Sequence, residues 1–204
     1  MSAVLDLARI APGFGDPVRE SQAVFRELME STARPGRLAR FAQAPAAPAP
    51  LNRAAGAVAL TLFDFETLVW LDPALAGSEA ADWLRFHCGC PLAETPQTAA
   101  FALVTDMAQA PALADFHQGD AKYPDRSTTV ILQVEALEGG PVVSLSGPGI
   151  QTTTDIAPRG LPRDFWAQFE TNGAQFQFGV DVLLVADDQL IALPRTTHAQ
   201  IKGG

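Results

Sequence analysis

The chain has 204 residues, of which 48% are hydrophobic and 18% charged, and its formal net charge is −9. A chain of this length and hydrophobic content can bury a full core, which favours a single folded domain over residues 1–204 and argues against extended disorder. The acidic balance argues against nucleic acid as the main partner, because binding phosphate backbones needs a basic face.

No membrane-spanning or secretory segment is predicted. No window reaches the roughly 18 uninterrupted apolar residues that a membrane helix needs. The first residues, MSAVLDLARIAPGF, lack a basic run before an apolar stretch and are interrupted by Asp6 and Arg9, so they make a poor signal peptide. With two cysteines, a disulfide framework is not indicated, and we expect a cytoplasmic protein.

The first predicted helix begins at Asp16 and Pro17. An aspartate can cap free backbone N–H groups, and proline suits the first helical position because its missing N–H costs nothing there. The segment Arg34-Pro35-Gly36 is expected to end the helix. Residues at helical spacing within it are Val18, Ser21, Val24, Phe25, Leu28 and Met29.

An Ala/Pro segment, QAPAAPAP at 43–50, separates this helix from the next. Its composition predicts an exposed, extended surface loop rather than a domain boundary. Asn52 is then expected to cap an alanine-rich helix over 53–62. A third helix over 79–87 is expected to be capped by Ser78 and to bury Ala81, Trp83 or Leu84, and Phe86.

Continuous or β-branched apolar runs predict strands at 67–71, 99–104, 127–134 and 142–145. Two runs near the end, 180–186 and 190–193, flank the turn residues Asp187-Asp188-Gln189 and predict a hairpin. Helices are predicted over 108–117 and 164–171. Because helices and strands alternate and a hairpin is antiparallel, the predicted fold class is α/β, with helices on both faces of a mixed sheet.

Motifs of the common enzyme classes are missing, including glycine-rich phosphate loops, HExxH and GxSxG. Cys88-Gly89-Cys90 lies beside His87 without a second cysteine pair, so no metal site is predicted, and Gly89 is better interpreted as a left-handed helix cap. The two lysines, Lys122 and Lys202, lie in a polar loop and in the tail. This placement argues against a Schiff base and therefore against pyridoxal phosphate.

Polar residues that could carry chemistry occur at two places. Arg85 and His87 lie at a predicted helix end, where they either interact with the helix dipole or form an anion-binding or acid–base pair. Asp181 begins the hairpin, and Arg195 and His198 follow it. Because the ends of a hairpin come together, Asp181 and Arg195 are expected to pair and to position His198, unless Asp181 only accepts a hydrogen bond from a loop N–H.

Six stretches carry a resemblance to a known family: 26–29 with 35–36, 60–70, 84–92, 119–137, 145–150 and 179–198. Together they resemble the PhnH family, the H subunits of the bacterial carbon–phosphorus lyase system, which breaks down alkylphosphonates. The most specific parts are Leu-Arg-Phe-His at 84–87 and Pro-Arg-Thr-Thr-His at 194–198. The family usually has Phe-Pro where this chain has Phe176-Gln177.

The resemblance implies a three-layer α/β/α fold similar to the large domain of pyridoxal-phosphate-dependent transferases, without that cofactor. It also implies a homodimer in isolation and, in the cell, a core complex with the G, I and J subunits. That system transfers a phosphonate to the ribose C1′ of ATP and displaces adenine, so ATP and phosphonate are substrates of the complex. The H subunit is not expected to be catalytic alone.

Three functions are weighed on these grounds. The first is a complex subunit without a complete active site, which predicts a larger exposed apolar patch than an ordinary monomer has. The second is a phosphate- or phosphonate-binding contributor in which Arg85, His87, Arg195 and His198 converge on the ligand. The third is a freestanding acid–base hydrolase that uses His87 or His198 with Asp181.

Overall fold

The computed structural model of the chain describes residues 10–202, so most of the N-terminal stretch judged a poor signal peptide lies outside the described residues. The helices are α1 (Pro17–Ala33), α2 (Arg53–Leu62), α3 (Pro73–Ala76), α4 (Glu79–Cys88) and α5 (Phe165–Ala174). The strands are β1 (Ala39–Arg40), β2 (Val69–Leu71), β3 (Phe101–Val104), β4 (Thr129–Gln133), β5 (Val143–Ser146), β6 (Thr154–Ile156), β7 (Asp181–Ala186), β8 (Gln189–Leu193) and β9 (His198–Ile201). Short 3₁₀ turns are η2 (Pro96–Thr98), η3 (Met107–Gln109), η4 (Leu113–Asp115) and η5 (Pro124–Arg126).

The strands form two sheets, and the larger one is mixed as predicted. Its order is β1-β8-β7-β4-β3-β2, in which β2, β3, β4 and β7 are parallel while β8 and β1 run antiparallel to their neighbours. The predicted hairpin is the β7–β8 pair, with Ala186 opposite Gln189 at its turn. A smaller antiparallel sheet has the order β6-β5-β9. The mixed α/β class is therefore confirmed.

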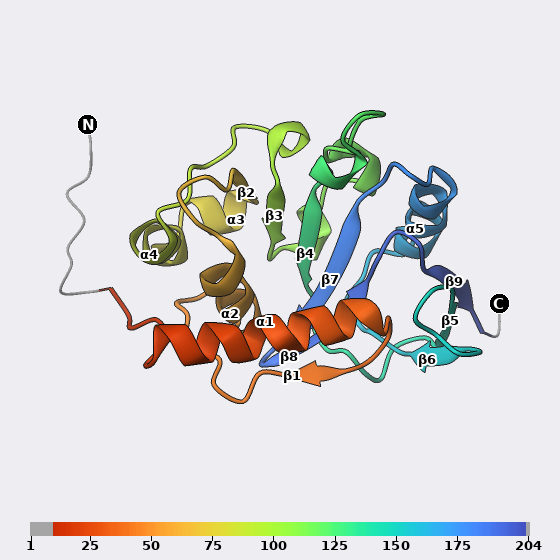
Figure 1. The fold of residues 1–204 in the computed structure, drawn as a ribbon, viewed down its shortest axis with the longest axis horizontal. Coiled ribbons are helices and arrows are strands. Elements are labelled where there is room, and N and C mark those ends of the chain that lie inside the picture. The colour runs from red at the N-terminus through yellow and green to blue at the C-terminus, as the bar shows by residue number, and fades with distance from the viewer. Residues whose placement is uncertain (1–9, 203–204) are drawn as a thin grey trace.

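Both faces of the large sheet are covered (Figure 1). Alternate residues of its central strands point to opposite faces, because side chains alternate along a strand. Ile131 and Leu183 belong to the cluster that contains α1, α2 and α4, whereas Val130 and Val182 belong to the cluster that contains α5 and the smaller sheet. Because both faces of the sheet are covered, the sequences of these strands are continuous apolar runs rather than alternating ones.

The predicted helix starts are confirmed where a side chain caps them. Asp16 Oδ1 accepts the N–H of Arg19 at 3.1 Å, and Asn52 Oδ1 accepts the N–H of Ala55 at 2.8 Å. Ser78 precedes α4 without a side-chain cap. Gly89 ends α4 in the left-handed region, with φ of 66°, as the sequence predicted.

The interior of α4 differs from the prediction at one position. Trp83 and Leu84 are both buried, at 1% and 0% exposure, whereas Phe86 is half exposed at 50%. Phe86 follows Leu84 by two positions, about 200° around the helix, and therefore leaves the buried face. The expectation that Phe86 is buried was wrong.

The predicted helix over 108–117 does not form. The chain makes two 3₁₀ turns instead, η3 and η4, with Pro111 between them. Proline lacks the backbone N–H that an α-helix needs, and its ring clashes with the carbonyl one turn earlier. The apolar spacing in this stretch serves packing of the turns, as burial of Leu113 shows.

The Ala/Pro segment at 43–50 is irregular, but it is less exposed than expected. Ala44 and Pro45 are buried, and the carbonyl of Ala44 accepts a hydrogen bond from Arg53 Nη2 at 2.8 Å. Ala47 lies close over α2: a Cβ placed on Gly56 of that helix would be 2.8 Å from the Cβ of Ala47. The segment thus covers α2.

Helix α1 crosses the molecule lengthwise with nothing drawn in front of it (Figure 1). Its inward side chains are Val24, Leu28 and Ser31. Three other apolar residues that recur at helical spacing are exposed, namely Val18 at 78%, Phe25 at 49% and Met29 at 56%.

No helix within residues 10–202 combines the length and apolar character that crossing a membrane requires.

Candidate functional site: the Asp181–Arg195 cluster

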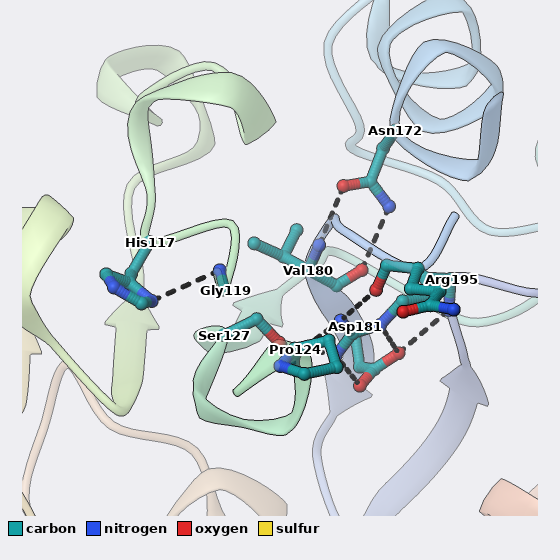
Figure 2. Close-up of polar contacts among 9 residues, drawn as sticks. His117, Gly119, Pro124, Ser127, Asn172, Val180, Asp181 and Arg195 are labelled. Carbon is teal, nitrogen blue, oxygen red and sulfur yellow. Dashed lines mark hydrogen bonds and ion pairs between the residues drawn. The ribbon is translucent and has the colours of Figure 1, made fainter. Parts of the chain in front are cut away.

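The predicted pair between Asp181 and Arg195 exists and is bidentate (Figure 2). Asp181 begins β7 and Arg195 follows Pro194 directly after β8, so the antiparallel hairpin brings them together. Nε of Arg195 donates to Asp181 Oδ1 at 3.2 Å, and Nη2 donates to Oδ2 at 2.7 Å. The backbone N–H of Arg195 donates to Oδ1 at 2.8 Å.

The remaining guanidinium donors also have partners. Nη1 of Arg195 donates to the carbonyls of Pro124 at 3.1 Å and Gln177 at 3.3 Å, and Nη2 donates to the hydroxyl of Ser127. These contacts, with the two to Asp181, engage all five N–H donors of a guanidinium. Arg195 therefore ties two loops to the hairpin and has no donor left for an anionic ligand.

A hollow of about 380 Å³ lies against this pair. Its lining includes the carboxylates of Asp125 and Asp181 and a single guanidinium, together with the exposed ring of Phe176. The charged groups of the lining sum to one negative charge, which opposes binding of a phosphonate or triphosphate. The hollow is lined mainly by apolar surface, and Asp181 and Arg195 form part of its wall.

Two residues that the sequence did not single out complete the surroundings (Figure 2). Asn172 of α5 clasps Val180, accepting its N–H at 2.8 Å and donating to its carbonyl at 2.9 Å. His117 Nδ1 accepts the N–H of Gly119 at 3.2 Å. Both contacts order the chain at the amino end of the parallel strands. Isolated polar residues at helix and loop ends give no periodic signal that would identify them.

His87 and Arg85 do not join this cluster. His87 is on α4, which lies at the opposite side of the molecule from β9 (Figure 1). Its Nε2 lies 2.9 Å from the carbonyl of Ala11, and its ring packs 4.9 Å from that of Trp83. Arg85 faces solvent beside Asp82 at 3.6 Å. These contacts agree with the helix-end interpretation, and the structure does not bring all the candidate residues together.

His198 is also apart from the pair that was expected to position it. It is the first residue of β9, opposite Ser146 of β5, and its side chain is exposed. The two residues before it, Thr196 and Thr197, turn the chain from the large sheet to the small one. Pairing of Asp181 with Arg195 is thus confirmed, whereas positioning of His198 by that pair is not seen.

The second large hollow, of about 530 Å³, lies at the carboxyl ends of β3 and β4. Its lining includes Thr105, whose backbone N–H and hydroxyl both donate to the buried carboxylate of Asp72. It also includes Gln133, whose side chain joins the backbone of Pro50 and Asn52. The polar groups at this edge are therefore engaged in holding loops together.

The two cysteines are free thiols at the end of α4. A hydrogen bond between them raises the pKa of Cys88, and burial acts in the same direction. The same hydrogen bond lowers the pKa of Cys90, and the nearby charge of Arg85 lowers it further. Within residues 10–202, no three His, Cys, Asp or Glu side chains are grouped so that they could hold a metal ion.

We predict that Cys90 loses its proton before Cys88 and that Cys88→Ala raises the pKa of Cys90. Removing the neighbouring thiol removes the donor that stabilises the Cys90 thiolate. Ultraviolet thiolate absorbance, read below the pH range in which the single tyrosine ionises, follows the titration of the chain's two cysteines. Cys88→Ser, which keeps a donor, is the control. An unchanged Cys90 titration in Cys88→Ala would contradict the prediction.

Three of the motifs behind the family resemblance, at 35–36, 145–150 and 194–198, meet at one junction. Gly36, after α1, donates its N–H to the carbonyl of Ala192 in β8 at 3.3 Å. Gly147, with φ of 126°, lies against the carbonyl of Thr196, 2.8 Å from where its Cβ would be. Gly149, with φ of 84°, lies against the carbonyl of Ala33 at the end of α1. These motifs join α1 and both sheets.

Fold and cluster together define an α/β domain in which the Asp181–Arg195 ion pair is held by contacts within the protein. A family model described as bacterial phosphonate metabolism protein (PhnH) matches residues 12–200. The chain belongs to this family, and the resemblance drawn from its sequence is confirmed.

Two curated relatives cover most of the chain. It is 48% identical over 187 residues to alpha-D-ribose 1-methylphosphonate 5-triphosphate synthase subunit PhnH of Rhizobium meliloti (strain 1021), covering 92% of this chain and 94% of the relative. It is 31% identical over 185 residues to the putative C-P lyase subunit protein HtxG of Stutzerimonas stutzeri, covering 89% and 87%. Both relatives are named as subunits.

Proposed function

We propose that this chain is a subunit of a carbon–phosphorus lyase complex and supports transfer of a phosphonate to the ribose C1′ of ATP. In that transfer a phosphonate oxygen bonds to C1′ as the bond from C1′ to adenine breaks. The observation that carries the proposal is 48% identity, over nearly the whole of both chains, to a protein named as a subunit of the triphosphate synthase.

The geometry of the polar cluster favours a role for the chain as a supporting subunit over catalysis by the chain alone. The five guanidinium donors of Arg195 are engaged within the protein. His87 and His198 lie on elements at opposite sides of the molecule (Figure 1). The two side chains therefore cannot act on the same substrate molecule. ATP and the phosphonate are then substrates of the assembled complex.

The finer features of the proposal come from the family. The partners are the G, I and J subunits, the isolated chain is a homodimer, and the complex is cytoplasmic. The large mixed sheet corresponds in this proposal to the large domain of pyridoxal-phosphate-dependent transferases, without the cofactor. The roles of Arg85, His87, Asp181, Arg195 and His198 toward substrate stay predictions.

Co-expression tests the proposed function. A tagged chain is expected to co-purify with the G, I and J subunits, and the assembly is expected to release adenine from ATP in the presence of methylphosphonate. Assemblies prepared without this chain are expected to be inactive or much slower. A chain that stays alone on co-expression, or that turns over phosphonate or phosphate esters by itself, would refute the proposal.

A further inference from the structure

The outer surface of α1 carries a line of four exposed side chains, of which three are apolar. We name Val18, Gln22, Phe25 and Met29 the α1 stripe; these residues are spaced by four, three and four positions. This spacing places them along one side of a helix. All four are exposed, and Figure 1 shows no element in front of α1.

Packing among residues 10–202 does not account for these exposed side chains. The core side of α1 is already provided by Val24 and Leu28, at 3% and 5% exposure. Phe25 and Met29 remain about half exposed. Aromatic residues, methionine and arginine are the types enriched in protein interfaces, and Arg26 lies next to the stripe on the same helix. An exposed line of this composition is typical of an interaction surface.

The charge beside the α1 stripe indicates what covers it. Arg26 is exposed and has no ion-pair partner within residues 10–202. The next two acidic residues of α1 are already paired, Glu27 with Arg37 at 2.9 Å and Glu30 with Arg34 at 2.7 Å. Within residues 10–202 one uncompensated positive charge, that of Arg26, therefore lies beside the stripe, although the whole chain carries a formal net charge of −9.

We propose that the α1 stripe docks into an apolar groove bordered by carboxylates on another subunit of the complex. This inference rests on the proposed function and names the surface that serves it. Carboxylates opposite Arg26 would compensate its charge and steer the encounter. A second copy of the chain fits less well. In a two-fold contact α1 would face α1, where Glu27 and Glu30 are already paired with arginines and would not compensate Arg26.

The test compares charge placed on the stripe with charge placed elsewhere. Phe25→Glu combined with Met29→Glu alters the stripe, whereas Phe65→Glu alters a side chain that is 75% exposed in the turn between α2 and β2. Roughly thirtyfold weaker binding of the partner subunits is expected for the double variant, as for loss of central interface anchors. The Phe65→Glu chain is expected to bind like wild type, and all chains should unfold at similar temperatures.

A charge series tests the chemistry of the occupant. Binding is expected to weaken in Arg26→Glu, to survive in Arg26→Lys, and to weaken for wild type as salt is raised. Equal binding by Arg26→Glu would exclude an acidic groove. Sedimentation equilibrium of the isolated chain examines the other occupant: a double variant that loses self-association but still enters the complex would assign the stripe to a second copy and overturn the proposal.

The result also separates this inference from the proposed function. Failure of the wild-type chain to co-purify with G, I and J would refute both. Co-purification of wild type together with undiminished binding by the Phe25→Glu, Met29→Glu variant would leave the proposed function standing and refute the docking surface alone.

Discussion

Asp181→Asn is expected to lower the free energy of unfolding by about 2 kcal/mol, less than the effect of breaking a fully buried ion pair, because the Asp181 side chain is 35% exposed. The substitution keeps the shape of the side chain but replaces one acceptor oxygen with an amide that points a donor at Arg195. That arginine is 12% exposed and depends on Asp181 for the compensation of its charge. Urea denaturation followed by circular dichroism measures the change.

Asp125→Asn is the matched control. Asp125 lines the same hollow but is exposed, so its change should stay within about 0.5 kcal/mol. The complex offers a second measurement. At temperatures where the Asp181→Asn chain is folded, the adenine-release rate of the assembly should equal that of wild type, because Arg195 is engaged internally. An unchanged stability with a reduced rate would assign the pair to catalysis.

Local geometry explains why this pair could be predicted from the sequence. Asp181 and Arg195 are the two ends of one hairpin, and a hairpin fixes which residues face each other. His87 could not be placed in the same way, because its position depends on packing of α4 and contact with Ala11. The sequence also could not predict that the Arg195 donors are all engaged, because two of their acceptors, Pro124 and Ser127, come from a loop that is distant in the sequence.

The helices show the same difference between local and distant information. Periodicity identified α1, but it could not tell that Val24 faces the core while Phe25 faces solvent, since both lie within one apolar band of the helix. The short strands were missed for a related reason. β1 has two residues, and its pairing with β8 supplies the structure that its sequence does not signal.

Gly149→Ala is expected to have the largest effect on stability, about 4 kcal/mol. Two terms add. The φ of 84° is a left-handed conformation that costs a residue with a Cβ about 1–2 kcal/mol. The Cβ would also lie 2.2 Å from the carbonyl oxygen of Ala33, which belongs to backbone at the end of α1 and cannot move aside cheaply.

Two other glycines separate these terms. Gly139 has φ of 82° with nothing within 4 Å of its Cβ position, so Gly139→Ala should show the conformational cost alone, about 1–2 kcal/mol. Gly77 has open space and φ of −93°, and Gly77→Ala should be nearly neutral. Equal effects in the Gly139 and Gly149 variants would show that contact with α1 is unimportant. The predicted order implies that the family motif at 145–150 stabilises the end of α1, and with it the helix that presents the α1 stripe.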